Sequence, residues 1–589
     1  MATERVKPSE EKAWLSTFRP EDAEFRFSQE SLYESICHTR DNNGVAFRYF
    51  GMPFSYVRFH DMIDRAARAF ASRGIVKGDT VMMMLPTLPE TLVSFYALNR
   101  LGAVVDFIDV RFTPERVLEI ARRVRPKMLL VMTFYLKKLE TVRADLPVDR
   151  ILLLRGCDSM PKSVLFWYRL GEHFNGRRRL TRRSKKYLFW SDFMSEGPDR
   201  SAQNCDGSQE FHGGALKADV NAHDTACIFQ TSGTSGFPKS MCHSNFNMVN
   251  SAISKYRYLN DPKPGDRLLS MLPPFSMFGF VFNIHMPLMF GMTLEIVPLF
   301  VPEKMSEILA KRRPNHILCV PSQWNSVAAT PARNHDLSFL KTVFVAGESV
   351  DRTLRNRVNA FFAANGSRAV LQTDYGMTEA GGTIVFTTYE KACENELSKG
   401  YSGYPAPWTE VCIYDNEKQC ELDYGEVGEI CAIPPFGIRE YLNDADATGE
   451  LMKRHADGKA WVHTGDIGYL AEDGSLHLEG RRKRMIVRFD GTKIFPIEIE
   501  TAIKGVKGVG DCTVVPMTDT EHDHSQLPCA FVVAESGAGK DLERDIMNLC
   551  SRELPVYLQP AEIRFVDRIP HNSAGKADFR QLMEQLKAQ

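Results

Sequence analysis

Short apolar runs alternate with amphipathic stretches along most of the chain, and this alternation predicts the fold. TVMMMLP at 80–86 precedes the helix-like PETLVSFYALNRLGA, after which VVDFIDV returns to a strand-like pattern. Further buried strands are predicted at 316–321 and at 340–349, each leading into a loop. Such alternation is typical of layered α/β domains built on mostly parallel sheets. Residues 411–433 differ, because two strand-like runs flank a polar turn with a glycine, which predicts a β-hairpin or a small barrel.

The C-terminal part of the chain predicts a separate, smaller unit. The runs GVGDCTVVPM, CAFVVAE, LERDIMNLCSREL and EIRFVDRIP indicate a strand–strand–helix–strand order, and the charged run GRRKR at 480–484 precedes them. A chain of 589 residues is also too long for a single core. We therefore expect a large N-terminal domain of layered α/β subdomains with a small β-barrel-like subdomain over 1–482. A small mobile α+β C-terminal domain is expected over 483–589.

Composition narrows the class of protein. With 43% hydrophobic and 25% charged residues, the chain has the make-up of an ordinary soluble globular protein, and its net charge of −1 gives no bulk attraction to nucleic acid. The most apolar run, 286–302, contains Glu295 and internal prolines, so no transmembrane helix is expected, and the charged N-terminus predicts no secretory signal. The 13 cysteines form no C-x-x-C pair, which favours reduced thiols in a cytoplasmic protein over disulfides or zinc. EHDHS at 521–525 is interpreted as a solvated loop rather than a zinc site.

One segment breaks the alternation. Between 161 and 190, aromatic residues flank a strongly basic run. A solvated surface insertion is one interpretation. The other is a peripheral contact with the inner face of a membrane, in which basic side chains meet anionic lipid. In that case four aromatic side chains would enter the lipid interface: Phe166, Trp167, Phe189 and Trp190.

The stretch TSGTSGFPKS at 231–240 follows the apolar run TACIFQ and predicts a phosphate-binding loop. Glycines let a backbone approach an anion closely, and successive N–H groups in such turns form an anion-binding concavity. Hydroxyl groups add donors and a lysine adds a compact positive charge. The residues expected to bind phosphate are Thr231, Ser232, Gly233, Thr234, Ser235, Gly236 and Lys239. The spacing is not that of the G-x-x-x-x-G-K-[ST] loop.

Together with three later segments, this loop resembles the signature motifs of the adenylate-forming (AMP-binding) enzyme family, in its acyl-CoA synthetase branch. LQTDYGMTEAGG at 371–382 resembles the YGxTE segment, and 461–487 resembles the TGD and GR-x-K segments. PHNSAGKADFR at 570–580 resembles the C-terminal segment with the catalytic lysine. The resemblance extends from about residue 45 to the end. Two positions depart from it, since Ser240 replaces a common glycine and Arg484 occupies the usual hinge position.

The resemblance implies that a carboxylate attacks the α-phosphate of ATP, and that coenzyme A then takes the acyl group. Glu379 is expected to bind Mg²⁺, because a carboxylate beside a phosphate needs a cation between them. Thr378 is expected to bind phosphate, Tyr375 to stack on adenine and Asp374 to accept from its amino group. The neighbouring positions Gly376 and Met377 belong to the same nucleotide-binding segment.

The resemblance also implies roles for residues elsewhere in the chain. Gly347 and Glu348 would line the adenine or acyl site, and Asp466 and Arg481 would bind the ribose. Lys576 would bridge the carboxylate and the α-phosphate as the catalytic lysine, and would leave during the CoA step as the C-terminal domain rotates. Lys239, Thr378 and Glu379 complete the expected catalytic set.

The substrate is predicted to be an apolar carboxylic acid, fatty or aryl, with a fatty acid preferred. Phe and Met are dense at 272–291, and such residues line adaptable apolar pockets as well as ordinary cores. Ser276 stands where relatives often have histidine, and Trp324 is a candidate for the acyl tunnel. Alternatives are an acyl-AMP ligase that loads a carrier protein, an aryl- or bile-acid-type CoA ligase, and a non-catalytic nucleotide-binding regulator.

Overall fold

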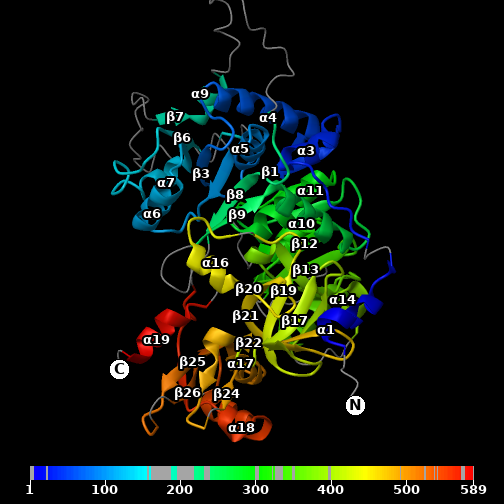
Figure 1. The fold of residues 1–589 in the computed structure, drawn as a ribbon, viewed down its shortest axis with the longest axis vertical. Coiled ribbons are helices and arrows are strands. Elements are labelled where there is room, and N and C mark those ends of the chain that lie inside the picture. Colours follow the sequence, from blue (N-terminus) through cyan, green and yellow to red (C-terminus); the bar gives the residue numbers. More distant parts are fainter. Residues whose placement is uncertain are drawn as a thin grey trace, which may run out of the picture.

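The computed structural model describes residues 6–20, 24–155, 158–160, 187–195, 218–230, 239–298, 304–321, 323–324, 336–347, 350, 352–394, 400–438, 440–490, 492–522, 525–535, 537–539, 541–571 and 577–587. It contains two large sheets and a small C-terminal unit, which follow one another from top to bottom in Figure 1. The fold is the predicted mixed α/β architecture with a large N-terminal part and a small C-terminal part.

Seven strands form the first sheet, in the order β7-β6-β5-β3-β4-β8-β9, and all neighbours are parallel except β8 and β9. Its strands and main covering helices are β3 (Thr80–Met84), β4 (Val104–Phe107), β5 (Met128–Met132), β6 (Arg150–Leu154), β7 (Tyr187–Phe189), β8 (Thr225–Gln230), β9 (Ser240–Ser244), α4 (Tyr56–Ala71), α5 (Pro89–Arg100) and α6 (Pro114–Val124). The predicted strand at 80–86 shows how both faces are covered. Val81 and Met83 pack in the core with α4 and α5, whereas Met82 and Met84 pack with α6.

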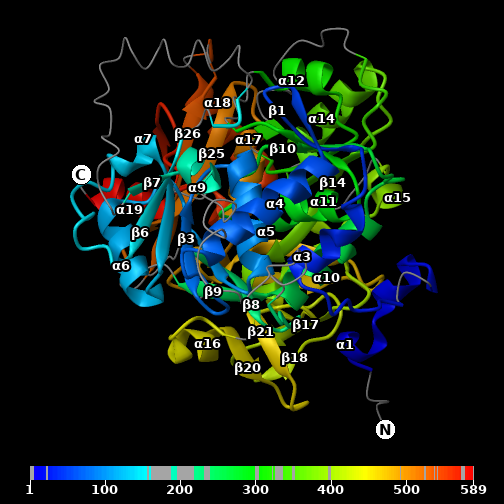
Figure 2. The same cartoon turned by 90° about the horizontal axis from the view of Figure 1, so that it is seen from above.

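The first part of the second sheet is parallel except for the antiparallel β1–β2 pair, and the rest of the sheet is antiparallel. Its first part has the order β2-β1-β11-β10-β12-β13-β14, and the predicted strands at 316–321 and 340–349 are confirmed as β12 and β13. These elements are β1 (Val45–Tyr49), β2 (Met52–Ser55), β10 (Arg267–Ser270), β11 (Thr293–Ile296), β12 (His316–Cys319), β13 (Thr342–Ala346), β14 (Leu371–Met377), α10 (Asn245–Arg257), α12 (Met305–Arg312) and α14 (Arg352–Ala364). One hydrophobic core joins α4 and α5 to strands of both sheets, so these helices lie between them (Figure 2).

The described part of the apolar run, 286–298, comprises the short helix α11 (Met286–Met289) and the strand β11 of this sheet. Glu295 on β11 is only 1% exposed, and its carboxylate lies 3.2 Å from Arg48 and 3.3 Å from Arg312. The arginines supply the opposite charge that a buried carboxylate requires. Among the described residues, no helix has the length and apolar character needed to cross a membrane.

The antiparallel continuation carries the predicted hairpin at 411–433. Its elements are β15 (Gly382–Phe386), β16 (Tyr401–Pro405), β17 (Glu410–Asp415), β18 (Cys420–Glu421), β19 (Gly428–Ile433), β20 (Met452–Arg454), β21 (Ala460–Leu470) and β22 (Leu476–Arg481). Val411 and Ile413 of β17 face one buried core together with Trp14. The alternating residue Cys412 faces the opposite side, where it packs with Cys431.

The C-terminal unit has the predicted strand–strand–helix–strand order. It comprises α17 (Pro496–Lys504), β25 (Val509–Thr518), β26 (Gln526–Ala534), α18 (Leu542–Glu553), β27 (Glu562–Phe565) and α19 (Phe579–Lys587). The antiparallel β25–β26 pair and the parallel strand β27 form its sheet, and α17 and α18 share a separate core with it. The unit lies at one end of the molecule, beyond β22 (Figure 1).

The interpretation of 161–190 as a membrane contact is wrong for two of its aromatic residues. Phe189 and Trp190 are each 6% exposed and pack inside the protein, so neither reaches a lipid surface. Phe166 and Trp167, like the rest of 161–186, lie outside the described residues.

Candidate active site

The YGMTE segment is the last part of β14 and the short turn that follows it. A Cβ atom at Gly376 would lie 1.8 Å from the carbonyl oxygen of Gly382, so only glycine permits this close approach to β15. Gly381 ends the turn at φ +79°. The tight turn places Thr378 and Glu379 at the end of the strand, with Met377 before them packed against neighbouring hydrophobic residues.

Asp374, expected to accept from adenine, forms a buried ion pair. Its Oδ2 atom lies 2.6 Å from Nζ of Lys255 on α10 and accepts a hydrogen bond of 3.1 Å from Thr383. Burial lowers the pKa of Lys255, and the attraction of Asp374 opposes this shift. A contact of Asp374 with adenine stays a prediction, and such a contact would share this carboxylate with the lysine.

Tyr375, Asp466 and Arg481 come together from three different strands. The hydroxyl of Tyr375 on β14 donates to Oδ2 of Asp466 on β21 at 2.9 Å. The Asp466 Oδ1 atom lies 2.8 Å from Nε of Arg481, its register partner on β22. Burial, followed by the Asp466 charge, raises the pKa of Tyr375, so the phenol stays a protonated donor. Asp466 is largely buried, whereas Arg481 is exposed.

Glu379 and Lys239 meet at the ring of Tyr441. The Tyr441 hydroxyl donates to Oε1 of Glu379 at 2.7 Å, and Nζ of Lys239 lies 5.0 Å from the centre of the same ring. Burial and the Glu379 charge raise the pKa of Tyr441, which keeps it protonated. The hydrogen-bond donor to this half-buried carboxylate is thus a neutral hydroxyl. The Glu379 carboxylate is a suitable ligand for Mg²⁺, which binds one or two carboxylates together with phosphate oxygens.

Sequence reasoning missed Lys255 and Tyr441, which lie far along the chain from the residues they bind. It also missed the partners of Ser240. The Ser240 hydroxyl donates to Gln230 at 2.9 Å, and the Gln230 amide donates to the buried Asp106 at 2.7 Å. The serine in place of the family's common glycine therefore links β9, which begins with Ser240, to the end of β8.

Some predicted site residues lie outside the described residues. These are Thr231, Ser232, Gly233, Thr234, Ser235, Gly236, Glu348 and Lys576. Their neighbours are described: Lys239 precedes β9, and Gly347 follows β13 at φ +88°. His571 and Ala577 form an antiparallel bridge on either side of the segment that contains Lys576.

Part of the Phe- and Met-rich stretch forms a π-helix, η4 (Phe278–His285), which packs against α10 and β10. Phe282 approaches β15, the strand paired with β14, so closely that a Cβ at Gly382 would lie 2.7 Å from its ring. The Ser276 hydroxyl accepts from the N–H of Gly279 and donates to the carbonyl of Pro273, so it caps the turn before η4. Trp324 is fully buried and donates to the Cys319 sulfur, which places it in a core rather than on an accessible tunnel surface.

The charged run before the C-terminal unit contacts both the N-terminal part and the C-terminal unit. Arg482 lies 3.3 Å from Glu429 of the antiparallel sheet, on the N-terminal side. Arg484 instead pairs with Glu500 on α17 and lies 4.0 Å from the ring centre of Phe579 on α19. The change from one set of partners to the other therefore occurs within the single turn η7 (Arg482–Arg484).

Known proteins of similar sequence and fold identify the family of the chain. The chain is 25% identical to 4-coumarate–CoA ligase 1 of Petroselinum crispum over 92% of its length and 91% of that protein. It is 24% identical to a long-chain-fatty-acid–CoA ligase of Bacillus subtilis (strain 168), over 98% of both chains. The crystal structure of an anthranilate CoA ligase in complex with anthranoyl-AMP has the same fold, with a TM-score of 0.79 at 18% identity, over 96% of this chain and 98% of that one. Residues 37–442 match the AMP-binding enzyme family and residues 498–576 match its C-terminal domain, so the chain belongs to the AMP-binding enzyme family.

Proposed function

We propose that the protein is an AMP-forming acid–CoA ligase that activates an apolar carboxylic acid. The observation on which this proposal rests is the convergence of Tyr375, Asp466 and Arg481 at 2.9 Å and 2.8 Å from three strands. A carboxylate beside an aromatic ring and a guanidinium suits a nucleoside, since the ring can stack on a base and the carboxylate can accept from ribose hydroxyls. The family match and the CoA ligases among the relatives support the same reaction.

The main physical problem of the first step is charge repulsion, because a carboxylate has to approach a polyphosphate. Positive groups and positioning must therefore supply most of the catalysis. Lys239 and Arg481 are the described cations next to the predicted phosphate and ribose positions. Glu379 would hold Mg²⁺, which neutralises phosphate charge when bound. The products of this step are acyl-AMP and pyrophosphate.

In the second step the sulfur of CoA attacks the acyl carbon, the bond between this carbon and the AMP oxygen breaks, and AMP leaves. Lys576 is proposed to act in the first step and to withdraw in the second. For this, the C-terminal domain proposed at 483–589 would rotate about the η7 turn. The partners of Arg482 and Arg484 support a hinge there, since the first arginine binds the N-terminal part and the second binds the C-terminal unit.

A fatty acid is the preferred substrate and an aryl acid the second candidate. The fatty-acid proposal is supported by the B. subtilis relative, which matches over nearly the full length. The aryl proposal is supported by the 4-coumarate relatives and by the anthranilate ligase structure. Loading of a carrier protein, a cytoplasmic location and contact with a membrane surface remain parts of the proposal still to be tested.

Pyrophosphate release from ATP should be measured with a panel of acids from acetate to palmitate, with benzoate and 4-coumarate added. Each buried CH₂ contributes about 0.8 kcal/mol, so kcat/KM should rise about fourfold per carbon until the pocket is filled. A profile that is flat along the fatty acids but high for the aryl acids would favour the second candidate. If no acid releases pyrophosphate, the proposed ligase activity is wrong. Formation of thioester with CoA alone separates a CoA ligase from an enzyme that loads a carrier.

The role of Lys576 is tested with Lys576→Ala. One well-aimed donor contributes about 3 kcal/mol to the transition state, so adenylation should slow by about 10²–10³-fold. Lys507→Ala is the matched control, because Lys507 is an exposed lysine of the same C-terminal unit. Formation of acyl-AMP by Lys576→Ala at the rate of this control would refute the assignment.

A further inference from the structure

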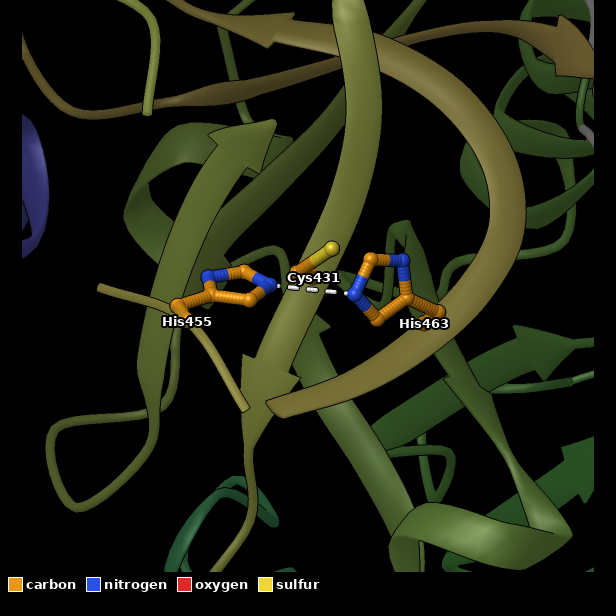
Figure 3. Close-up of side chains that lie close together, drawn as sticks. All are labelled: Cys431, His455 and His463. Carbon is orange, nitrogen blue, oxygen red and sulfur yellow. Dashed lines mark hydrogen bonds between the residues drawn. The ribbon is translucent and has the colours of Figure 1, made fainter. Parts of the chain in front are cut away.

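A cysteine and two histidines meet on the antiparallel sheet, on the face opposite its buried core. The sulfur of Cys431 and one ring nitrogen each of His455 and His463 all lie within 4.8 Å of one another (Figure 3). The two Nε2 atoms are 3.0 Å apart and point toward each other. These residues have no part in the proposed acid activation, and nothing in their sequence spacing joins them.

The sheet register explains why the side chains converge. Cys412 of β17 is the register partner of Cys431 on β19, and Cys431 pairs with His463 on β21. Directly opposed residues of antiparallel strands point to the same face, so the three side chains form a row across three strands. The row is shielded from water, because both cysteines are fully buried and His463 is 7% exposed.

His455 completes the cluster from the turn between β20 and β21. The carbonyl of His455 accepts from Gly458, and its N–H donates to the carbonyl of Lys459, which fixes the turn. The imidazole stacks on Tyr414 at a ring-centre distance of 3.8 Å and on Trp461 at 5.3 Å. Two aromatic faces thus hold the ring with its Nε2 atom directed at the cluster.

A carboxylate orients the second histidine from behind. Nδ1 of His463 lies 3.0 Å from Oε2 of Glu429, which leaves Nε2 as the ring atom available for a metal. The Asn416 amide donates to the same carboxylate oxygen at 2.6 Å. Metal-binding histidines usually have such a carboxylate on the other ring nitrogen, where it fixes the tautomer and strengthens the ligand.

We propose that Cys431, His455 and His463 bind a structural zinc ion, with Cys412 as the fourth ligand. Zinc takes thiolate and imidazole ligands in a tetrahedron, and sites with two cysteines and two histidines are common. With Zn–N distances of about 2.0–2.1 Å, two nitrogens of a tetrahedron are about 3.3 Å apart, close to the separation observed here. The soft sulfur–nitrogen donor set excludes Mg²⁺ and Ca²⁺, which prefer oxygen. Binding would release the thiol protons to solvent.

The ion would tie the β20–β21 turn to the sheet and fix Glu429. The second oxygen of Glu429, Oε1, accepts the N–H of Gly465 at 3.0 Å, directly before Asp466. Arg482, at the proposed hinge, also lies 3.3 Å from Glu429. The zinc site would therefore support the turn predicted to bind the ribose from the opposite side of the sheet.

Metal content decides the proposal without any activity measurement. Full-length protein without a histidine tag, expressed in zinc-supplemented medium and passed over a chelating resin, should retain about one zinc per chain. Replacement by Co²⁺ should give thiolate-to-cobalt absorption in the near ultraviolet and the visible bands of tetrahedral cobalt. Protein with less than about a tenth of an equivalent of zinc and no cobalt spectrum would overturn the proposal.

Three variants and a control locate the ion. Cys431→Ser and His455→Gln should lose it, and Glu429→Gln should bind it about 10–100-fold more weakly. Cys420→Ser is the matched control, since Cys420 is an exposed cysteine of the same sheet. Because Cys431→Ser can also destabilise the buried face, the partly exposed His455→Gln is the decisive variant. Zinc retained by His455→Gln at the level of the control refutes the site, as does a Cys412–Cys431 disulfide found by thiol titration of metal-depleted, air-free protein.

Discussion

Removal of Lys255 tests whether the buried ion pair behind the nucleotide segment holds β14 in place. The Lys255 and Asp374 side chains are 0% and 3% exposed, and Nζ lies 2.6 Å from Oδ2. The ammonium group also lies 3.6 Å from the ring centre of Phe344, so little water reaches it. In Lys255→Met the Asp374 carboxylate would stay buried, and the Thr383 hydroxyl would still donate a hydrogen bond to it. Breaking such a pair from one side costs about 3–5 kcal/mol.

The expected effect is measurable as a melting shift. In a domain this large the entropy of unfolding approaches about 1 kcal/mol/K, so a loss of about 3 kcal/mol lowers the apparent Tm by about 3 °C at a fixed scan rate. The double variant Lys255→Met/Asp374→Asn removes both charges and should recover at least half of the loss, because a neutral pair has no charge to desolvate. Melting should be followed by tryptophan fluorescence in the presence and absence of ATP.

The exposed pair Lys263–Asp261 provides the control. Its atoms are 3.0 Å apart, but its side chains are 64% and 69% exposed, so Lys263→Met should leave the Tm unchanged within error. The reasoning is wrong if Lys255→Met has the same apparent Tm as Lys263→Met. It is also wrong if the double variant melts below Lys255→Met, since the loss would then come from packing rather than from an uncompensated charge.

Three further predictions concern the site and the pH dependence of stability. Asp466→Asn should raise the KM for ATP about tenfold, because hydrogen bonds to a charged group contribute about 1.5–3 kcal/mol, and should leave the KM for the acid unchanged. Glu379→Gln should lower kcat/KM for ATP about a hundredfold. Tyr441→Phe should lower kcat/KM less than about tenfold, because this change removes only a neutral hydrogen-bond donor. Equal losses in the two variants would contradict the metal-binding role of Glu379. Burial alone would raise the pKa of Asp266, but hydrogen bonds from a histidine and a lysine outweigh it and hold the pKa at about 2. A lowered pKa stabilises the fold above the unfolded value of about 3.9, so Asp266→Asn should unfold at lower urea at pH 7, and its difference from the wild type should vanish as the pH falls from about 4 to about 2.

The fold was predictable where local patterns decide it. The strands β3, β12 and β13 are continuous apolar runs because both faces of a parallel sheet are covered, and the hairpin around β18 alternates because its two faces differ. The pairing of β1 with β11 was not predictable, because these strands are distant in sequence and no local period encodes which edge they join. The prediction that Phe189 and Trp190 contact a membrane was wrong for a related reason, since the sequence does not distinguish an exposed aromatic residue from a buried one.

The candidate site also contains residues that the sequence predicts and residues that it does not. Gly376 and Asp466 lie in compact motifs, where the backbone turn and the functional side chain are neighbours in sequence. Their partners Lys255 and Tyr441 act across tertiary contacts, and each belongs to a helix or loop whose own pattern is ordinary. Helix α10 also buries Asn250, Ser251 and Ser254, so its sequence pattern does not mark Lys255 as buried.

The cluster at Cys431 shows most clearly what a search for motifs leaves out. Absence of C-x-x-C argues against a zinc knuckle, in which a tight turn sets the spacing of the ligands. On an antiparallel sheet the register sets it instead, so partners on adjacent strands can be separated by any loop that the fold accommodates, here the chain from Cys412 to Cys431 and from there to His463. The sequence signal is the position within the alternation. In each of these strands a Cys or His lies where a hydrophobic residue is expected, on the face opposite the one that packs on the core. A sheet alignment that placed those positions opposite one another would have predicted the row, and only the turn that carries His455 would have remained unknown.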